Sequence, residues 1–234
     1  MTTLHRLSLA AWVASFALLA GCSDHGHSVA IAADAEAAMS PSLPDLPTDI
    51  SPLLIGEPAP AFTLPDAAGE PFTFDPEALE RPVVLVFYRG GWCPYCSAHM
   101  MELRKAEQNI LDMGFDLIFT SPDRSELLAE ALAQGELDYT LLSDTELKAA
   151  RGFGVAFRVD DETAAKYLEY GINLQEASGQ DHQGLPVPAV FIIGTDGMIR
   201  FEYINPNYKV RIGAELLLAG AEAALSQKPL KPLR

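Results

Sequence analysis

One segment, Phe87–Cys96, constrains the fold of this chain more than any other; its sequence is FYRGGWCPYC. It follows an unbroken apolar run, Val83–Val86, and apolar residues at helical spacing continue after it to about residue 111. This pattern predicts a buried strand that turns directly into a helix. Cys93 and Cys96 would therefore lie at the start of that helix.

A thiol at the start of a helix is placed to ionise. Cys93 is predicted at the N-cap and Pro94 at the first helical position, where a missing N–H costs nothing. The free backbone N–H groups and the positive helix end then favour the thiolate of Cys93. In CxxC motifs the pKa of the first cysteine falls from about 8.5 to roughly 3.5–7.5, and the second cysteine can close a disulfide. The segment is thus predicted to be a redox dithiol.

Two other uses of the motif compete with redox chemistry. A copper or zinc ion could bind Cys93, Cys96 and His99, although zinc prefers four ligands and the sequence has no second CxxC. Covalent haem attachment needs a histidine after the second cysteine, and Ser97 stands there. The metal site stays open as an alternative, and no cofactor is expected.

The amino terminus predicts export and a lipid anchor. Residues 7–20 form an apolar run that is too short to span a membrane but suits a signal peptide, and Leu19–Cys22 resembles the lipobox of bacterial lipoproteins. The resemblance implies a signal peptide over residues 1–21, a lipid on Cys22 and a flexible tether over 22–54. Since Ser23 is not the aspartate that retains lipoproteins in the inner membrane, we expect an outer-membrane anchor facing the periplasm. An ordinary secretory signal is the alternative.

Cysteine count and charge narrow the function further. With Cys22 lipidated, Cys93 and Cys96 are left to pair with each other in an oxidising compartment. The formal net charge of −16 would repel phosphate backbones, so nucleic-acid binding is not expected.

Alternating strand and helix patterns predict an α/β domain over residues 55–228, followed by a tail over 229–234. The order is that of a thioredoxin-like three-layer sandwich with a central mixed β-sheet, an N-terminal hairpin, and an insertion that arches over one sheet edge before the strand at 190–193. We expect strands at 59–64, 71–74, 83–88, 115–121, 140–142, 190–193 and 198–203, helices at 94–113, 123–134, 145–152 and 210–225, and the insertion, with a helix at 161–170, over 155–185.

Three segments together resemble a known family. They are Phe87–Cys96, Leu185–Ala189 before a strand, and Asp196–Arg200. Over about residues 55–225 the chain resembles a CxxC branch of the alkyl hydroperoxide reductase/thiol-specific antioxidant family, which is peroxiredoxin-like. The resemblance implies reduction of hydroperoxides and a thioredoxin-like electron donor. It also implies that Pro188 is a cis-proline packed against the dithiol.

The resemblance leaves open which sulfur attacks first. In thioredoxins the first cysteine attacks, which would be Cys93, and Cys96 would resolve. Aligned to peroxiredoxins, Cys96 takes the place of the peroxidatic cysteine, Cys93 that of the threonine and Arg89 that of the proline.

Other side chains were assigned supporting roles. Arg89, Arg200 and Arg211 are candidates to stabilise an anion or the thiolate. Arg89 lies in the active turn itself and is assigned to the catalytic site with the two cysteines, whereas Arg200 and Arg211 are expected on the solvated surface. The buried acid of thioredoxins aligns with Val86, which leaves Glu202, Tyr208 and His182 as weak substitutes. Trp92, Pro94, Tyr95 and Pro188 are predicted to position the substrate.

Three functions are consistent with these features. The leading hypothesis is a hydroperoxide reductase that uses Cys93 and Cys96 in a dithiol–disulfide cycle. A protein disulfide reductase without peroxidase activity is the alternative enzyme. A Cu(I) metallochaperone is the alternative outside the enzymes.

Overall fold

The structure of the protein is a computed structural model that describes residues 42–135 and 140–226. The predicted signal peptide, the lipidation site at Cys22 and the tail over residues 229–234 lie outside the described residues. Within the described ranges, no helix combines the length and the apolar character needed to cross a membrane.

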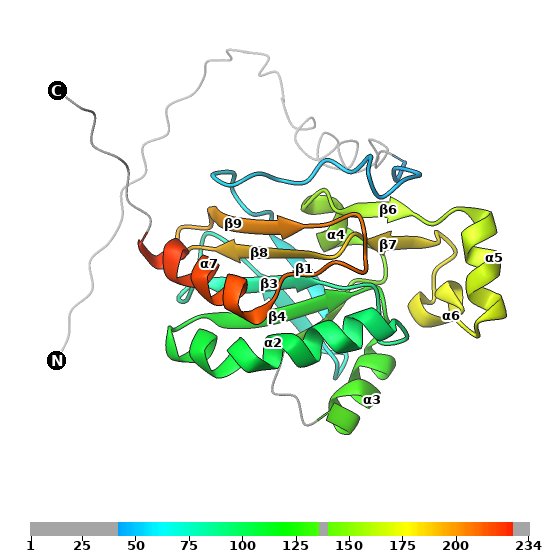
Figure 1. Ribbon diagram of the computed structural model, residues 1–234, viewed down its shortest axis with the longest axis horizontal. Helices are drawn as coiled ribbons and strands as arrows, with labels where there is room; N and C mark the ends of the chain where they lie inside the picture. The colour runs from blue at the N-terminus through cyan, green and yellow to red at the C-terminus, as the bar shows by residue number, and fades with distance from the viewer. Residues whose placement is uncertain (1–41, 136–139, 227–234) are drawn as a thin grey trace, which may run out of the picture. The chain divides into compact units, whose positions relative to one another are not determined.

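A buried strand, β3 (Val83–Phe87), forms the centre of the fold, and none of its residues is more than 2% exposed. It pairs in parallel with β4 (Asp116–Ser121) and antiparallel with β8 (Ala189–Ile193). The edges are β5 (Thr140–Ser143) and β9 (Ile199–Ile204), so the order is β5-β4-β3-β8-β9. The predicted central mixed sheet is confirmed (Figure 1).

Helices cover one face of the sheet, and a hairpin with a short helix covers the other. On the first face α2 (Pro94–Asp112), α3 (Ser125–Gly135) and α7 (Ala214–Ser226) pack over a cluster that includes both cysteines (Figure 1). On the second face lie the predicted hairpin, β1 (Phe62–Pro65) with β2 (Pro71–Phe74), and α4 (Lys148–Gly152). These layers confirm the thioredoxin-like fold.

The spacing of apolar residues explains how α2 lies on the sheet. Its buried residues are Cys96, His99, Leu103, Ala106 and Ile110, which recur every three or four positions and form one face. The helix ends at Asp112, and Gly114 follows with a φ of +88°, a conformation that glycine adopts at little cost. Cys96 lies on this buried face in the first turn of α2, so its side chain is part of the core.

The folded unit begins earlier than the predicted boundary at Ile55. The Leu53 N–H donates to the Phe153 carbonyl at 3.2 Å, and the Arg158 N–H donates to Pro44 at 2.8 Å. Gly154, with a φ of +69°, lies so close to Ser51 that a β-carbon would be 2.0 Å from the Ser51 carbonyl oxygen. Residues 42–54 thus belong to the domain, because backbone bonds hold a segment that lacks apolar periodicity.

The insertion lies at the end of the sheet and not over an edge strand, which corrects the prediction. It contains β6 (Ala156–Arg158), α5 (Asp161–Glu169), α6 (Leu174–Ser178) and β7 (Gly184–Pro186), and β6 and β7 pair as a separate sheet. The Arg124 N–H donates to the Ala177 carbonyl at 2.9 Å, which fastens the insertion to the loop after β4. Its helices therefore lie beside the start of α2 (Figure 1).

Candidate active site

Two glycines and a buried carboxylate shape the turn between β3 and α2. Gly90 has a φ of +140°, and a β-carbon there would lie 2.7 Å from Asp123 Oδ1 and 2.4 Å from Trp92 Nε1. The Gly91 N–H donates to Asp123 Oδ2 at 2.6 Å. Only glycine fits at position 90, because both the backbone conformation and the space exclude a side chain.

The dithiol occupies the predicted place at the start of α2. Cys93 is the N-cap, its backbone is extended, and Pro94 stands in the first turn. Cys93 and Cys96 are both free thiols and both about 1% exposed. The structure therefore shows the reduced form of the dithiol, with both sulfurs buried.

The surroundings of the two sulfurs drive their pKa values apart. The pKa of Cys93 falls to about 6, chiefly because the Cys96 thiol donates a hydrogen bond to it, with help from the charges of Arg89 and Arg211. The pKa of Cys96 rises well above its usual value, because that same hydrogen bond and burial both favour its protonated form. At neutral pH the site thus holds a Cys93 thiolate next to a Cys96 thiol.

Arg89 is a buried cation directly beside the turn. Its Nη2 donates to the Tyr167 hydroxyl, and its guanidinium carbon lies 4.2 Å from the centre of the Tyr208 ring and 5.2 Å from that of Trp92. Among the described residues no carboxylate forms an ion pair with Arg89. Its charge lowers the pKa of Cys93, which makes the thiolate its natural counter-charge.

Arg211 also belongs to the site, and the expectation of a solvated surface role is wrong. Its Nη2 donates to Cys96 Sγ at 3.4 Å, and its Nε donates to the Tyr208 carbonyl at 2.6 Å. Residues 210–213 were predicted as the start of the last helix, but α7 begins at Ala214. The non-helical segment before α7 carries Arg211 to the dithiol. Arg200, in contrast, pairs with Asp196 near the surface, as expected.

The peptide bond before Pro188 is trans, which corrects the predicted cis-proline. The chain passes extended from β7 to β8, and the Val187 N–H donates to the Val155 carbonyl at 2.8 Å. This bond and the pairing of β6 with β7 hold the segment before β8 against the start of the insertion. Pro188 nevertheless lies by the site, because it lines a cavity of about 170 Å³ together with Arg89, Tyr167 and Tyr208.

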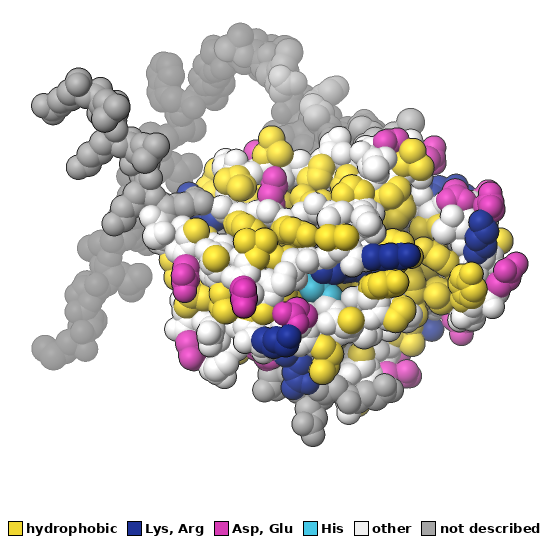
Figure 2. All heavy atoms as spheres, viewed as in Figure 1, with side chains coloured by type: hydrophobic (Ala, Val, Ile, Leu, Met, Phe, Trp, Pro, Cys, Tyr) yellow, Lys and Arg dark blue, Asp and Glu magenta, His cyan; other side chains and the backbone are white. Residues whose placement is uncertain are grey.

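Aromatic side chains surround the mouth of the site. Trp92 packs against Tyr167 with ring centres 5.9 Å apart, so the insertion contacts the active turn. Tyr95 is 41% exposed and meets Tyr208 edge to face at 5.5 Å. The ammonium of Lys209 lies 5.9 Å from the Tyr95 ring centre. Figure 2 shows basic and hydrophobic side chains together where the β9–α7 loop meets α2.

Two of the three substitutes considered for the buried acid of thioredoxins lie away from the dithiol. His182 accepts from the Gly184 N–H through Nδ1, with Nε2 2.7 Å from the Thr145 carbonyl. Glu202 lies on β9 opposite Phe191, which belongs to the other face of the sheet. Among Glu202, Tyr208 and His182, only Tyr208 lies near the dithiol. Its ring packs against the guanidinium group of Arg89.

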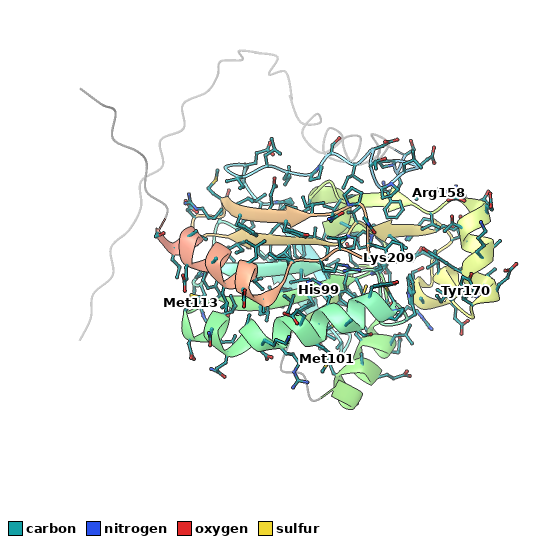
Figure 3. All side chains as sticks on the ribbon, in the orientation of Figure 1. His99, Met101, Met113, Arg158, Tyr170 and Lys209 are labelled. Atoms are coloured by element: carbon teal, nitrogen blue, oxygen red, sulfur yellow. The ribbon has the colours of Figure 1, made fainter. Side chains whose placement is uncertain are left out.

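His99 does not complete a metal site. It points from α2 toward the segment before α7, where Nε2 lies 3.1 Å from the Ile212 carbonyl (Figure 3). Burial, and then the nearby charge of Arg211, lower the pKa of His99 to about 4, so the ring is neutral and can donate to that carbonyl. Within residues 42–135 and 140–226 no three histidine, cysteine or carboxylate side chains gather into a metal-binding group.

Sequence reasoning missed Asp123, Arg211 and Tyr167 as residues of the site. Asp123 lies two residues after the predicted strand at 115–121, and a polar side chain just after a buried strand is a signal that could have found it. Arg211 and Tyr167 lack such a signal, because each reaches the turn only through the folded chain.

A redox dithiol at the start of a helix, on a central mixed sheet, defines a thioredoxin-fold thiol oxidoreductase. Comparison with known proteins narrows this class: residues 55–202 match the AhpC/TSA family. The chain belongs to the AhpC/TSA family of peroxiredoxin-like thiol enzymes.

The similar proteins include peroxiredoxins and a thiol:disulfide interchange protein. The peroxiredoxin Bcp of Escherichia coli is 32% identical over 106 residues, which span 45% of this chain and 67% of that protein. The thiol:disulfide interchange protein DsbE of Allochromatium vinosum is 28% identical over 162 residues, 68% of this chain and 72% of that protein. The crystal structure of the peroxidoxin BcpB of Mycobacterium tuberculosis has a TM-score of 0.54 at 23% identity, and covers 72% of this chain and 96% of that one. The structural likeness supports the fold.

Proposed function

We propose that this chain reduces hydroperoxides through a Cys93/Cys96 dithiol–disulfide cycle. The observation that carries the proposal is a pair of free thiols at the start of α2, with Cys93 at the N-cap and Arg211 donating to Cys96. The hydrogen bond from Cys96 and the charges of Arg89 and Arg211 lower the pKa of Cys93, while that hydrogen bond and burial raise the pKa of Cys96. A low-pKa thiolate is the nucleophile that attacks peroxides, and an adjacent thiol resolves the product. Cys93 is therefore the attacking sulfur in this proposal.

The cycle balances with the two cysteines and one donor. The Cys93 thiolate attacks the terminal oxygen of ROOH, the O–O bond breaks, and Cys93 becomes a sulfenic acid while RO⁻ takes a proton to leave as ROH. Cys96 then attacks the Cys93 sulfur, the S–S bond forms, and the sulfenic oxygen leaves as water. A thioredoxin-like dithiol restores both thiols by disulfide exchange, and itself becomes a disulfide.

Single-turnover kinetics test the proposal. Reduced wild type, Cys93→Ser and Cys96→Ser are mixed with hydrogen peroxide or an alkyl hydroperoxide, and sulfenic acid is trapped with dimedone. We expect fast consumption by wild type, one trapped sulfenic acid on Cys93 in Cys96→Ser, and loss of reactivity in Cys93→Ser. A sulfenic acid trapped only in Cys93→Ser would make Cys96 the attacking cysteine. Consumption no faster than that of free thiols would reject the peroxidase.

Protein disulfide reduction is the second candidate. It is favoured by the likeness to a thiol:disulfide interchange protein and by the exposed Tyr95 and Lys209 beside the dithiol, which offer a surface for a polypeptide. The two candidates separate in parallel assays. A disulfide reductase reduces insulin at a rate that depends on Cys93 and leaves peroxide untouched, whereas a peroxidase shows the reverse preference.

The amino-terminal sequence supports a location for this chemistry. Residues 1–21 would be removed as a signal peptide, and a lipid on Cys22 would hold the domain at the outer membrane, facing the periplasm. The dithiol would then work in an oxidising compartment, where it depends on a reductant for each turnover.

A further inference from the structure

Asp123 is a buried group that the proposed cycle leaves without a role. The residue is 2% exposed, its Oδ2 accepts from the Gly91 N–H, and its Oδ1 is buried with no hydrogen-bond partner. A buried carboxylate oxygen without a partner costs free energy, since the fold does not replace the water it has lost. Chemistry at the dithiol accounts for such a group better than structural support does.

The carboxyl group lies directly beneath the active turn. Its free Oδ1 is 2.7 Å from the point where a β-carbon on Gly90 would stand, three residues before Cys93. Burial raises the pKa of Asp123 to about 6, and the negative charge of Cys93 adds to that rise. The charge on the sulfur and the proton on the carboxyl group are therefore coupled.

A cavity connects this carboxyl group to its surroundings. Its volume is about 360 Å³, and its walls come from the active turn, α3 and the insertion. A space of this size holds several water molecules, which can carry protons to and from Asp123. The titratable and charged groups that face Asp123 or line this cavity are Tyr88, Cys93, Arg124, Glu130 and Glu176.

We propose that Asp123 is the proton donor that converts the oxygen leaving Cys93 into water when the disulfide closes. The proposal rests on the peroxidase cycle. The Cys96 proton goes to RO⁻ in the first step, so Cys96 becomes the thiolate that attacks Cys93. The S–S bond forms, the S–O bond breaks, and the departing hydroxide takes the Asp123 proton. Asp123 regains a proton through the cavity when the donor reduces the disulfide.

This step keeps the charge of the site constant. Near pH 6 part of the reduced site carries a Cys93 thiolate with Asp123 protonated, which is one negative charge, and after the disulfide closes that charge lies on Asp123. Arg89 and Arg211 therefore face the same total charge before and after turnover. The two protons that ROOH needs to become ROH and water come from Cys96 and Asp123.

Asp123→Asn tests the proposal, because asparagine can still accept from the Gly91 N–H but cannot donate a carboxyl proton. Asp144→Asn is the matched control: Asp144 is equally buried, with its pKa also raised to about 6, but its carboxylate accepts from Ala149 and Ala150 in α4. The full chain carries Trp12→Phe in every sample, so that Trp92 is its only tryptophan and reports on the dithiol.

Stopped-flow fluorescence then separates the two steps between pH 5 and 8. Sulfenic acid formation depends on peroxide concentration, whereas disulfide closure does not. We expect Asp123→Asn to slow closure on the order of 10²-fold while sulfenic acid formation changes little, because general acids contribute about that factor. Formate, which fits the cavity, should restore part of the closure rate in Asp123→Asn, an effect that a structural role would not produce. A wild-type closure rate and pH profile in Asp123→Asn would overturn the proposal.

A redox titration with dithiothreitol keeps this test independent of peroxide. If Asp123 takes up a proton on reduction, the reduction equilibrium of wild type changes more steeply with pH near 6 than that of Asp123→Asn, by up to tenfold per pH unit, or about 30 mV. Asp144→Asn should follow wild type. Equal slopes in all three chains would contradict the coupling. A wild type that ignores peroxide but keeps the slope difference would reject the peroxidase and retain Asp123 as the proton partner of the dithiol.

Discussion

Two arginines divide the electrostatic control of the dithiol. Arg89 is the larger cationic influence on the pKa of Cys93, whereas Arg211 alone touches Cys96. Arg89 is also enclosed by aromatic rings, which stabilise a cation through their negative faces. A thiolate with both charges nearby stays ionised in a site that excludes water.

Replacing either arginine should therefore raise the pKa of Cys93. We expect Arg89→Met to raise it more than Arg211→Met. At pH 6 it should slow alkylation of Cys93 by iodoacetamide about fivefold, as a shift of about one pKa unit from 6 implies. The measurement is the pH profile of alkylation of the reduced chain. Arg200→Met, whose arginine pairs with Asp196, is the control and should behave as wild type. A larger effect from Arg211→Met would reverse the assignment.

The depressed pKa of Cys93 also makes stability depend on pH. Between pH 6 and about 8.5 the unfolded chain holds the Cys93 proton and the folded chain does not, so the free energy of unfolding rises with pH across this window. The contribution is fully present above about pH 8.5, amounts to about 3 kcal/mol, and is lost as the pH falls through 6. Urea titrations of the reduced and disulfide forms should show their difference growing from pH 6 to 8. A constant difference would contradict a Cys93 thiolate in the folded state.

The insertion contributes to the site through α5, because Tyr167 on this helix supplies the hydroxyl group that accepts a hydrogen bond from Arg89. The N-cap Asp160 starts α5, accepting from the Thr163 N–H at 2.8 Å, and the helix then presents Tyr167 toward the turn. The insertion thus forms part of the wall of the site.

Tyr167→Phe isolates this contribution. The variant loses the hydrogen bond to Arg89 but keeps the ring against Trp92, so we expect little change in stability. The Cys93 alkylation rate at pH 6 should fall about twofold to threefold, in line with a hydrogen bond worth about 1 kcal/mol. Tyr170→Phe is the control, since Tyr170 ends the same helix and is 76% exposed. Equal rates in Tyr167→Phe and wild type would mean that the aromatic rings alone hold Arg89 in place.

The proposed lipid anchor at Cys22 concerns the location of the whole protein. We expect the wild-type chain, made in a Gram-negative host, to incorporate labelled palmitate and to fractionate with the outer membrane. Cys22→Ser should incorporate none, and Cys93→Ser should be labelled as wild type. The reason is that lipoprotein processing attaches the lipid to the cysteine after the signal peptide. An unlabelled wild-type chain would favour the ordinary secretory signal.

The local parts of the site could be predicted from the amino-acid sequence. The apolar run of β3, the turn glycines, and Cys93 with Pro94 at the start of α2 were all predictable, because each depends on neighbours within a few residues. The same local patterns predicted the order of strands and helices, and hence the fold.

Tertiary structure decided the partners of the dithiol. Arg211 contacts Cys96 across 115 residues of sequence, Tyr167 holds Arg89 across 78, and Asp123 meets Gly91 across 32. No periodicity or capping pattern links such pairs, since only the pairing of strands and the path of the insertion bring them together. For the same reason the position of the insertion and the trans peptide before Pro188 differed from expectation, because the folded surroundings of the chain set both.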